Sequence, residues 1–425
     1  MFSTTEQLGR ARNPNRLLER LSHASARLRE RHGVLRLELF HRGSDTVRVT
    51  RRRGRRAGLL SFGRDDGVAV RLLRRGEDGI RFAAVSGHDE EAFDEAVRCA
   101  LDHGAASRTV SDHWADRTDP LLDHATGFGP PSRDELVPWL DRAVRGFVEA
   151  RCAGDPDVVE QAWVEAAATV ETWAVDGRPA ASRTRKRGWA CLERAAGDGI
   201  GWRRPLLTAA ARWDEIDGGA WIRFDEQREA PIGLRAAIAG GHRTLVFTPE
   251  TSATLVSALI RFLAASRAPG RTPVGAGLRV WDAPDDPDAL FGGRFDDSGL
   301  EARRKLLADG NCLCEPIDGA GHDRRPSFRD PPQPMPSQLL VEPDPVEWPD
   351  GSFRVNRLSI QPLDTDRWVL DVGGVVEGGS VSQAFVPTGP SRLVAACSGG
   401  WGEAEASHRA VRTPFLVFDG LAVRC

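Results

Sequence analysis

Apolar and polar residues alternate in a series of short runs near the start of the chain, and this alternation limits the possible folds more than any other feature. Residues 35–39 read Leu-Arg-Leu-Glu-Leu, which is the two-residue period of a strand with one buried face. Glycine or an Asp-Gly pair separates the runs, as is typical of turns between antiparallel strands. We expect strands over 35–39, 47–49, 59–62, 68–73 and 80–84, with a turn at 41–45.

Two amphipathic helices are expected on either side of these strands. Residues 15–32 place Leu17, Leu21 and Leu28 on one face and end at Gly33, a residue type that commonly follows a helix. Residues 90–102 begin with acidic side chains, which suit the positive end of a helix dipole. A helix, antiparallel strands and a second helix together predict an α+β domain over residues 1–104.

Residues 105–215 are expected to form a second α+β segment. Ser132 and Glu135 have the spacing of a capping box at the start of a helix. Pro138 implies that this helix either kinks or begins later. The extended run 158–175 is closed by Asp176-Gly177, which indicates a hairpin with a return strand after it.

From about residue 216 the chain consists mainly of short apolar runs separated by Gly and Pro. This composition predicts a largely β C-terminal domain over 216–425, with a rolled or barrel-like sheet. One buried helix is expected over 249–263, because Thr248 suits the N-cap and Pro249 suits the first helical position. A smaller helix is expected at 300–308.

The overall composition favours a cytoplasmic protein. The chain has 425 residues and a net charge of −3, which gives no global reason to expect nucleic acid or an anionic membrane as a partner. Seven cysteines are scattered along the chain, and an odd, scattered number argues against a disulfide framework. No run approaches the roughly 18 apolar residues of a membrane-spanning helix.

The histidines exclude one group of metal sites. None of the ten is followed by Glu, whereas helical zinc-hydrolase motifs place a Glu base directly after the first His ligand. We therefore expect neither a metal ion nor another cofactor in this chain. The pairs Asp112-His113 and Asp123-His124 and the pair Cys312-x-Cys314 are weaker candidates, and each is more often structural than functional.

Two charged runs also have structural explanations. Arg51–Arg56 contains five arginines in six positions; a solvated hairpin tip is favoured over a grip on an acidic peptide or nucleic acid. Whether this run contacts a substrate or a partner stays open. The acidic residues 282–288 lack the pattern of a calcium-binding loop, so a turn-rich surface is expected there.

Seven segments carry a resemblance to a known family: Gly67–Arg71, Gly79–Ala83, Val246–Pro249, Leu278–Pro284, Phe295–Gly299, Lys305–Gly310 and Thr413–Val423. The most specific is the block 278–310, which contains the turns Asp-Ala-Pro, Phe-Asp-Asp-Ser-Gly and Leu-Leu-Ala-Asp-Gly. In this order along the chain, the segments resemble the TldD/TldE (PmbA) family of modified-peptide zinc metallopeptidases.

The resemblance implies that catalytic members carry His-Glu-x-x-x-His on the helix expected at 249–263. The three positions are Ser257, Ala258 and Phe262 here, and Cys397 corresponds to a further cysteine ligand as a relic. Ser298 stands where the family's turn usually has Glu.

These departures imply a TldE-like, zinc-free subunit that forms a heterodimer with a zinc-bearing TldD-like subunit. Such a pair would enclose a chamber that cuts unfolded peptides held as extended strands. Leader removal from a ribosomally made peptide is one role that the resemblance suggests.

Two other functions stay open. The chain could be a stand-alone peptide-binding or scaffold protein, for example a homodimer, without peptidase activity. An enzyme with new chemistry would have to use Cys397 or one of the Asp-His pairs.

Overall fold

The chain folds into two compact units. Unit 1 comprises Met1–Gly218, Gly292–Arg303 and Asp318–Pro336, and unit 2 comprises Gly219–Phe291, Arg304–Ile317 and Ser337–Cys425. The computed structural model describes residues 14–55, 58–104, 107, 114–115, 119–123, 131–152, 154–194, 206–210, 212–228, 241–266, 278–286, 289–309, 312–313, 323–325, 327–364, 367–376, 379–406 and 411–424.

Unit 1 is built on a seven-stranded sheet with the order β3-β2-β1-β5-β6-β4 and with β7 beside β6. Neighbouring strands run antiparallel, except for the parallel pair β4–β6. The strands are β1 (Arg36–Arg52), β2 (Leu59–Leu73), β3 (Arg81–Ser86), β4 (Leu121–Asp123), β5 (Val159–Val175), β6 (Arg178–Arg194) and β7 (Leu206–Ala210).

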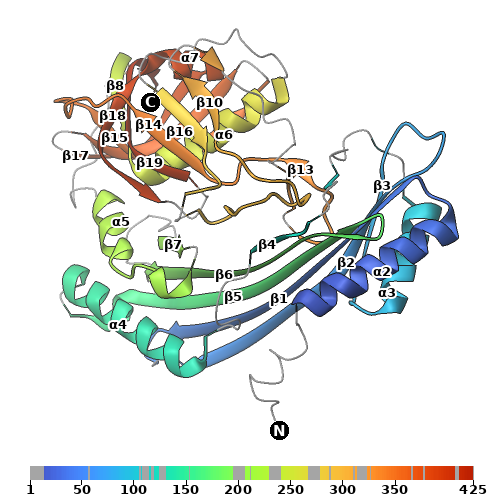
Figure 1. Cartoon of the computed structure of the whole chain (residues 1–425). Coiled ribbons are helices and arrows are strands. Elements are labelled where there is room, and N and C mark those ends of the chain that lie inside the picture. The colour runs from blue at the N-terminus through green and yellow to red at the C-terminus, as the bar shows by residue number, and fades with distance from the viewer. Residues whose placement is uncertain are drawn as a thin grey trace. The chain divides into compact units, whose positions relative to one another are not determined.

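Three helices accompany this sheet: α2 (Pro14–His32), α3 (Glu90–Asp102) and α4 (Arg133–Arg151). Figure 1 shows α2 and α3 together near one end of the long strands and α4 near the other. The apolar faces of α2 and α3 share one buried cluster with residues of β1, β2 and β5. The predicted capping box is present, since the Ser132 amide donates to Glu135 Oε2 at 2.7 Å, and Pro138 lies inside α4. Short 3-10 helices span Pro156–Val158 and Trp213–Glu215.

The prediction of a turn at 41–45 is wrong. These residues lie in the middle of β1, which pairs with β2 on one side and β5 on the other along its whole length. The strands expected at 59–62 and 68–73 are likewise one strand, β2. Because a neighbour on each side satisfies the backbone of β1, Gly43 and Ser44 stay extended in spite of their local preference for turns.

Unit 2 contains a ten-stranded sheet with the order β11-β10-β9-β14-β19-β8-β15-β16-β17 and with β18 beside β19. Its parallel pairs are β14–β19 and β8–β15. The strands are β8 (Gly241–Phe247), β9 (Leu278–Asp282), β10 (Lys305–Asp309), β11 (Cys312–Leu313), β14 (Leu339–Pro343), β15 (Phe353–Pro362), β16 (Trp368–Val376), β17 (Gly379–Thr388), β18 (Cys397–Ala406) and β19 (Val411–Val423). A small separate sheet pairs β12 (Asp323–Arg324) with β13 (Gln333–Pro334) in unit 1.

The sheet of unit 2 curls around the helix α6 (Pro249–Ser266). Two backbone hydrogen bonds between Phe385 and Arg424, at 2.7 and 2.8 Å, bring β17 back to the end of β19. Residues of α6 and of the inner faces of β8, β15, β16, β17 and β19 form one buried cluster. The expected α+β class, with a helix and antiparallel sheet first and a rolled, largely β region carrying one buried helix second, is confirmed. Two short helices, α5 (Ala220–Arg228) and α7 (Pro390–Ala396), complete unit 2.

The prediction of a smaller helix at 300–308 is wrong. Lys305–Asp309 forms β10, which pairs with β9. The segments 1–104 and 105–215 lie in one compact unit, because β1 pairs with β5 and joins both segments in one sheet. The first stretch of this unit ends at Gly218, three residues beyond the boundary expected at 215. None of the helices in the described part of the chain combines the length and the apolar character needed to cross a bilayer.

Candidate functional site

The start of α6 is held by side-chain hydrogen bonds to three strands of unit 2. Thr251 Oγ1 donates to the carbonyl of Val355 in β15 at 3.0 Å. Ser252 Oγ donates to the carbonyl of Phe247 in β8 at 3.1 Å and accepts from the amide of Leu416 in β19 at 3.3 Å. Both side chains are buried, so these bonds satisfy polar groups that water cannot reach.

Two of the three positions compared with the zinc motif lie on the least buried stripe of α6. Thr254, Ser257 and Ala258 are half-buried and Arg261 is exposed, and their spacing places them on one helix face. The opposite face is buried in the core through Ala253, Leu255, Val256, Leu259 and Ile260. The side chain of Phe262 lies outside the described residues. The accessible stripe therefore presents a hydroxyl group at 257 and a methyl group at 258.

Cys397 lies in the same core as α6, at the first position of β18, and is only 3% exposed. Burial raises the pKa of its thiol to about 12. In this structure Cys397 packs as an apolar residue.

The side chains at α6 and β18 do not fit a zinc ion, since Ser257, Ala258 and Cys397 offer one hydroxyl group and one sulfur where three ligands are needed. Within the described parts of the chain, no three His, Cys, Asp or Glu side chains lie close enough to hold a metal. Asp112-His113, His124 and Cys314 lie outside the described residues, and so does the side chain of Cys312.

The Phe295–Gly299 turn belongs to unit 1 and is bound to its sheet. Arg183 of β6 donates from Nη1 to the Phe295 carbonyl at 2.8 Å and pairs through Nη2 with Asp297. Trp173 of β5 donates to the Asp297 carbonyl at 3.0 Å. Gly299 has a φ of +78°, a conformation that favours glycine. Buried polar contacts therefore hold the segment with the most specific family resemblance.

Ser298 takes part in this turn as a hydrogen-bond donor. Its Oγ donates to Asp323 Oδ2 at 2.6 Å, and its amide donates to Asp296 Oδ1 at 2.9 Å. Burial, followed by repulsion from Asp323, raises the pKa of Asp296 to about 7. A Glu at position 298 would place a third carboxylate beside these two, whereas serine adds a donor and no charge.

A buried network of charges extends from the turn into the sheet. Glu171 of β5 lies 2.5 Å from Arg183 and 3.2 Å from Arg42 of β1. Burial disfavours the charged form of Glu171, but these two guanidinium groups outweigh it and lower the pKa to about 2. The pKa of Asp297 is also lowered, because Arg183 and Arg185 overcome the effect of burial. The carboxylates of this network are therefore ionised at neutral pH.

A second buried cluster joins the segment 323–325 to the sheet. Glu38 of β1 accepts from Arg71 Nε at 3.1 Å and Nη2 at 2.5 Å, and from Arg325 Nη2 at 2.5 Å. All three side chains are at most 1% exposed. Arg325 also donates from its amide to Asp297 Oδ2 at 2.6 Å, so the two networks are continuous.

Asp66 lies between two histidines that the sequence did not single out. His41 Nε2 is 2.7 Å from Asp66 Oδ1, and His88 Nδ1 is 3.3 Å from Asp66 Oδ2. Position 41 is in β1, position 66 is in β2, and position 88 follows β3. No sequence motif marks such a group, because only the pairing of β1 with β2 and of β2 with β3 brings the residues together.

The charged runs of the sequence have separate structural settings. Residues 52–55 of the arginine run are exposed, as a solvated hairpin tip requires, while Arg51 lies 3.8 Å from Asp141 of α4. Arg51 and α4 line a cavity of about 560 Å³.

Asp282 departs from the expected turn-rich surface, because it is fully buried and accepts from the Ser337 amide at 2.9 Å.

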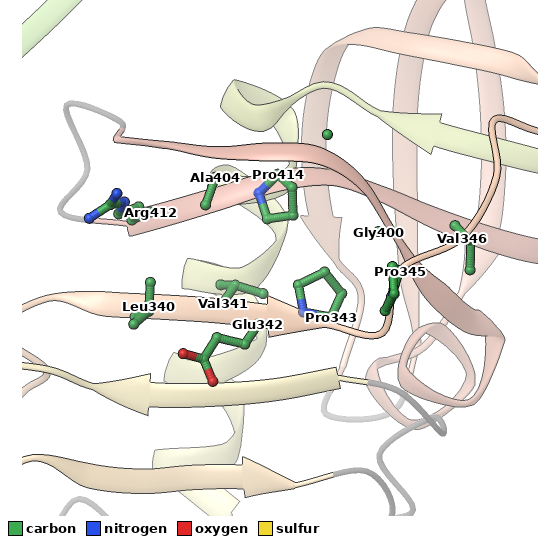
Figure 2. A pocket seen from close by; sticks show the side chains of 11 residues that line it. Leu340, Val341, Glu342, Pro343, Pro345, Val346, Gly400, Ala404, Arg412 and Pro414 are labelled. Carbon is green, nitrogen blue, oxygen red and sulfur yellow. The ribbon is translucent and has the colours of Figure 1, made fainter.

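Unit 2 also contains a cavity of about 480 Å³ between β14 and the strands β18 and β19. Parallel pairing of β14 with β19 ends at Leu340 and Arg412, and Figure 2 shows Pro343 and Pro414 on opposite sides of the gap beyond that point. Proline has no amide proton to donate across it. Nearby, the exposed side chains of Trp348 and Trp401 form an aromatic cluster with the half-buried Phe415, with ring centroids 5.0 to 5.9 Å apart.

Comparison with solved structures places this fold among known ones. TldE from Thermococcus kodakarensis aligns with a TM-score of 0.72 and 13% identity over 96% of this chain and 100% of that one. A candidate modulator of DNA gyrase from Bacteroides thetaiotaomicron aligns with a TM-score of 0.70 and 14% identity over 96% and 98% of the two chains. A candidate modulator of DNA gyrase from Thermotoga maritima aligns with a TM-score of 0.66 and 12% identity over 95% of this chain and 99% of that one.

Comparison with protein-family models and with curated proteins gives no match. The likeness to the solved structures nevertheless extends over nearly the whole of each chain. This chain therefore has the fold of TldE, in agreement with the resemblance to the TldD/TldE family that its sequence segments carry.

Proposed function

We propose that this chain is a TldE-like, non-catalytic subunit of a heteromeric zinc peptidase. The observation that carries the proposal is a TldE-like fold along 96% of the chain in which Ser257 and Ala258 occupy the accessible stripe of α6. In the family resemblance these positions hold the first zinc ligand and the base. The helix and its hydrogen bonds to the surrounding strands are retained, while side chains that neither bind zinc nor act as a base replace the zinc motif.

A TldD-like subunit would supply the zinc ion and the hydrolytic chemistry. This chain would contribute part of the wall of a chamber and stabilise its partner. An unfolded peptide suits such a chamber, because backbone pairing with a sheet edge reads an extended chain with little dependence on its side chains. The edge strand β3 of unit 1 is one element of this kind. A leader segment of a ribosomally made peptide is the substrate that we would test first.

Co-expression with a TldD-like subunit from the same genome tests the proposal. We expect a stable complex that contains zinc and cleaves an unfolded peptide, and an isolated chain that does neither. The proposal fails if no complex forms and the partner cleaves the same peptide unaided.

Zinc analysis of the isolated chain by mass spectrometry tests the non-catalytic role separately. We expect a zinc content far below one ion per chain, in the wild type and in a Cys397→Ala variant alike. Cys191→Ala is the matched control, because Cys191 is also a buried cysteine. Stoichiometric zinc that is lost only on Cys397→Ala would contradict a non-catalytic role.

A stand-alone peptide-binding protein is the second candidate. The exposed aromatic side chains of Trp348 and Trp401 beside the cavity of unit 2 favour it, since clustered exposed aromatic residues often mark binding surfaces. Light scattering of the isolated chain distinguishes the two functions. A stable homodimer that binds peptides and ignores a TldD-like subunit would favour the second candidate.

A further inference from the structure

The exposed rings of Trp348 and Trp401 lie on the face of the unit 2 sheet that is turned away from α6. Trp401 of β18 pairs in register with Phe415 of β19, and Gly400 pairs with Leu416. Leu416 belongs to the core around α6, and neighbouring residues of a strand point to opposite faces. Phe415 and Trp401 therefore point away from that core. Trp348 packs edge-on against both rings, with centroids 5.0 and 5.9 Å away.

Backbone hydrogen bonds hold the segment that carries Trp348. The amide of Val346 donates to the Gly400 carbonyl at 3.0 Å, and the amide of Gly400 donates to the Asp344 carbonyl at 2.8 Å. The cavity of about 480 Å³ adjoins the rings, because Val346 and the glycines on either side of Trp401 line it. Aromatic rings that are already held in place lose little freedom when a ligand binds.

Other tryptophans of this chain carry an arginine over the ring. Guanidinium carbons lie 4.3 to 5.0 Å from the ring centroids of Trp114, Trp163, Trp173 and Trp281. No arginine or lysine in the described parts of the chain lies over Trp348 or Trp401, although both are exposed. A cation is attracted to the face of an indole ring, so these two rings offer a contact that no cation of the described chain uses.

The two segments that carry the exposed rings are acidic. Residues 341–352 and 397–406 contain no Lys, Arg or His but contain Glu342, Asp344, Glu347, Asp350, Glu403 and Glu405. Nearby, Arg304 lies 3.6 Å from Glu342 and Arg412 lies 3.7 Å from Asp286. Four carboxylates are exposed and form no ion pair with any described residue: Asp344, Glu347, Asp350 and Glu403. We call these four residues and the three rings the aromatic–acidic patch; its excess negative charge complements a basic ligand.

We propose that the aromatic–acidic patch binds an extended basic segment of another protein, with an arginine side chain of that segment stacked on Trp401 or Trp348. Arginine suits the patch, because its planar guanidinium group stacks on aromatic faces and is always charged. The exposed carboxylates attract the same group, whereas they repel nucleic acid and acidic peptides. The adjoining cavity can accept a neighbouring side chain of the segment, since its volume is within the usual range of ligand pockets.

This inference goes beyond the proposed function. The aromatic–acidic patch is turned away from α6, so it is separate from the positions that were compared with the zinc motif. Complex formation and cleavage test the proposed function, whereas peptide binding by the isolated chain tests the inference. The two can therefore fail separately.

Fluorescence anisotropy with labelled peptides tests the inference on the isolated full-length chain. The probes are an alternating Arg-Ser octapeptide, the same peptide with citrulline in place of arginine, and an alternating Glu-Ser octapeptide. Citrulline keeps the shape of arginine and lacks its charge. We expect the arginine peptide to bind about tenfold or more tightly than the other two, with binding weakened by added salt. Equal binding of the arginine and citrulline peptides would overturn the inference.

Trp401→Ala should weaken binding of the arginine peptide about fivefold or more, because it removes an exposed ring face. Phe62→Ala is the matched control and should leave binding unchanged, since Phe62 of β2 is an exposed aromatic residue of unit 1 outside the patch. Unchanged binding in Trp401→Ala would overturn the inference.

A double variant that keeps all the rings tests the charges. Glu347→Gln combined with Glu403→Gln should weaken binding of the arginine peptide about threefold or more and reduce its salt dependence. Glu19→Gln combined with Glu91→Gln is the matched control, because it changes the net charge equally at exposed positions of α2 and α3. Equal losses in the two double variants would mean that binding follows net charge alone, and would overturn the inference.

Light scattering tests whether a second copy of this chain is the occupant instead. The exposed residues 52–55 of the arginine run are themselves a basic segment. We expect Trp401→Ala to leave the molar mass of the isolated chain unchanged. A dimer that is lost in Trp401→Ala would overturn the assignment of the patch to another protein.

Discussion

Replacement of Arg183 by methionine should destabilise unit 1 by about 3–5 kcal/mol, the usual cost of leaving buried charges without their partner. Arg183 is 1% exposed and lies 2.5 Å from Glu171, with Asp297 as its second partner. Methionine keeps much of the volume beside the rings of Trp173 and Phe295, over which the guanidinium now lies. The loss therefore reports mainly on two buried carboxylates that lose a counter-ion.

Urea unfolding followed by far-ultraviolet circular dichroism and tryptophan fluorescence measures this loss, with separate transitions fitted where the two units do not unfold together. Arg212→Met is the matched control, because Arg212 pairs with Asp214 at 2.7 Å but is 61% exposed. Its replacement should change the free energy of unfolding much less than Arg183→Met, since exposed ion pairs contribute little. Addition of Asp297→Asn to Arg183→Met should recover part of the loss. A loss below about 1 kcal/mol in Arg183→Met would refute the claim that the network depends on this arginine.

Three further predictions concern single sites. The pKa of Asp296 rises from 3.8 to about 7 on folding, so its contribution to stability is complete below about pH 4 and is lost as the pH rises toward 7. Asp296→Asn should remove this part of the pH dependence of the free energy of unfolding. An unchanged slope of that free energy against pH would contradict the prediction. Gly67→Ala should destabilise unit 1 by about 1–3 kcal/mol, because the added Cβ would lie 2.1 Å from the ring of Phe328. Phe328→Ala should then lower the free energy of unfolding less in the Gly67→Ala background than in the wild type. Strictly additive losses would show that the clash is absent. Cys397 should resist iodoacetamide at pH 8 in the folded chain, since burial raises its pKa to about 12, and rapid labelling detected by peptide mass spectrometry would mean that the thiol is accessible.

Elements with strong local signals could be predicted from the sequence. The amphipathic runs 15–32, 90–102 and 249–263 correspond to α2, α3 and α6. The Asp176-Gly177 hairpin is confirmed, with φ values of 51° and 86° that Asp and Gly tolerate better than most residues. In each case the residues that specify the element lie within the element itself.

Elements that depend on distant neighbours could not be predicted in the same way. Residues 41–45 have a local preference for a turn, yet pairing with β2 and β5 extends them. Residues 305–309 form a strand because β9 lies beside them. Local propensity is weaker than the hydrogen bonds and packing that two neighbouring strands supply.

The sequence by itself determined that no helical His-Glu zinc motif exists in this chain, because such a motif is a local pattern that can be searched residue by residue. The order of its short segments also pointed to the TldE-like fold. Only the tertiary structure decided that Cys397 is buried, which raises the pKa of its thiol, and that Arg183 and Asp297 meet across 114 positions of sequence. Burial and ion pairing depend on which strands lie side by side, and no local pattern specifies that arrangement.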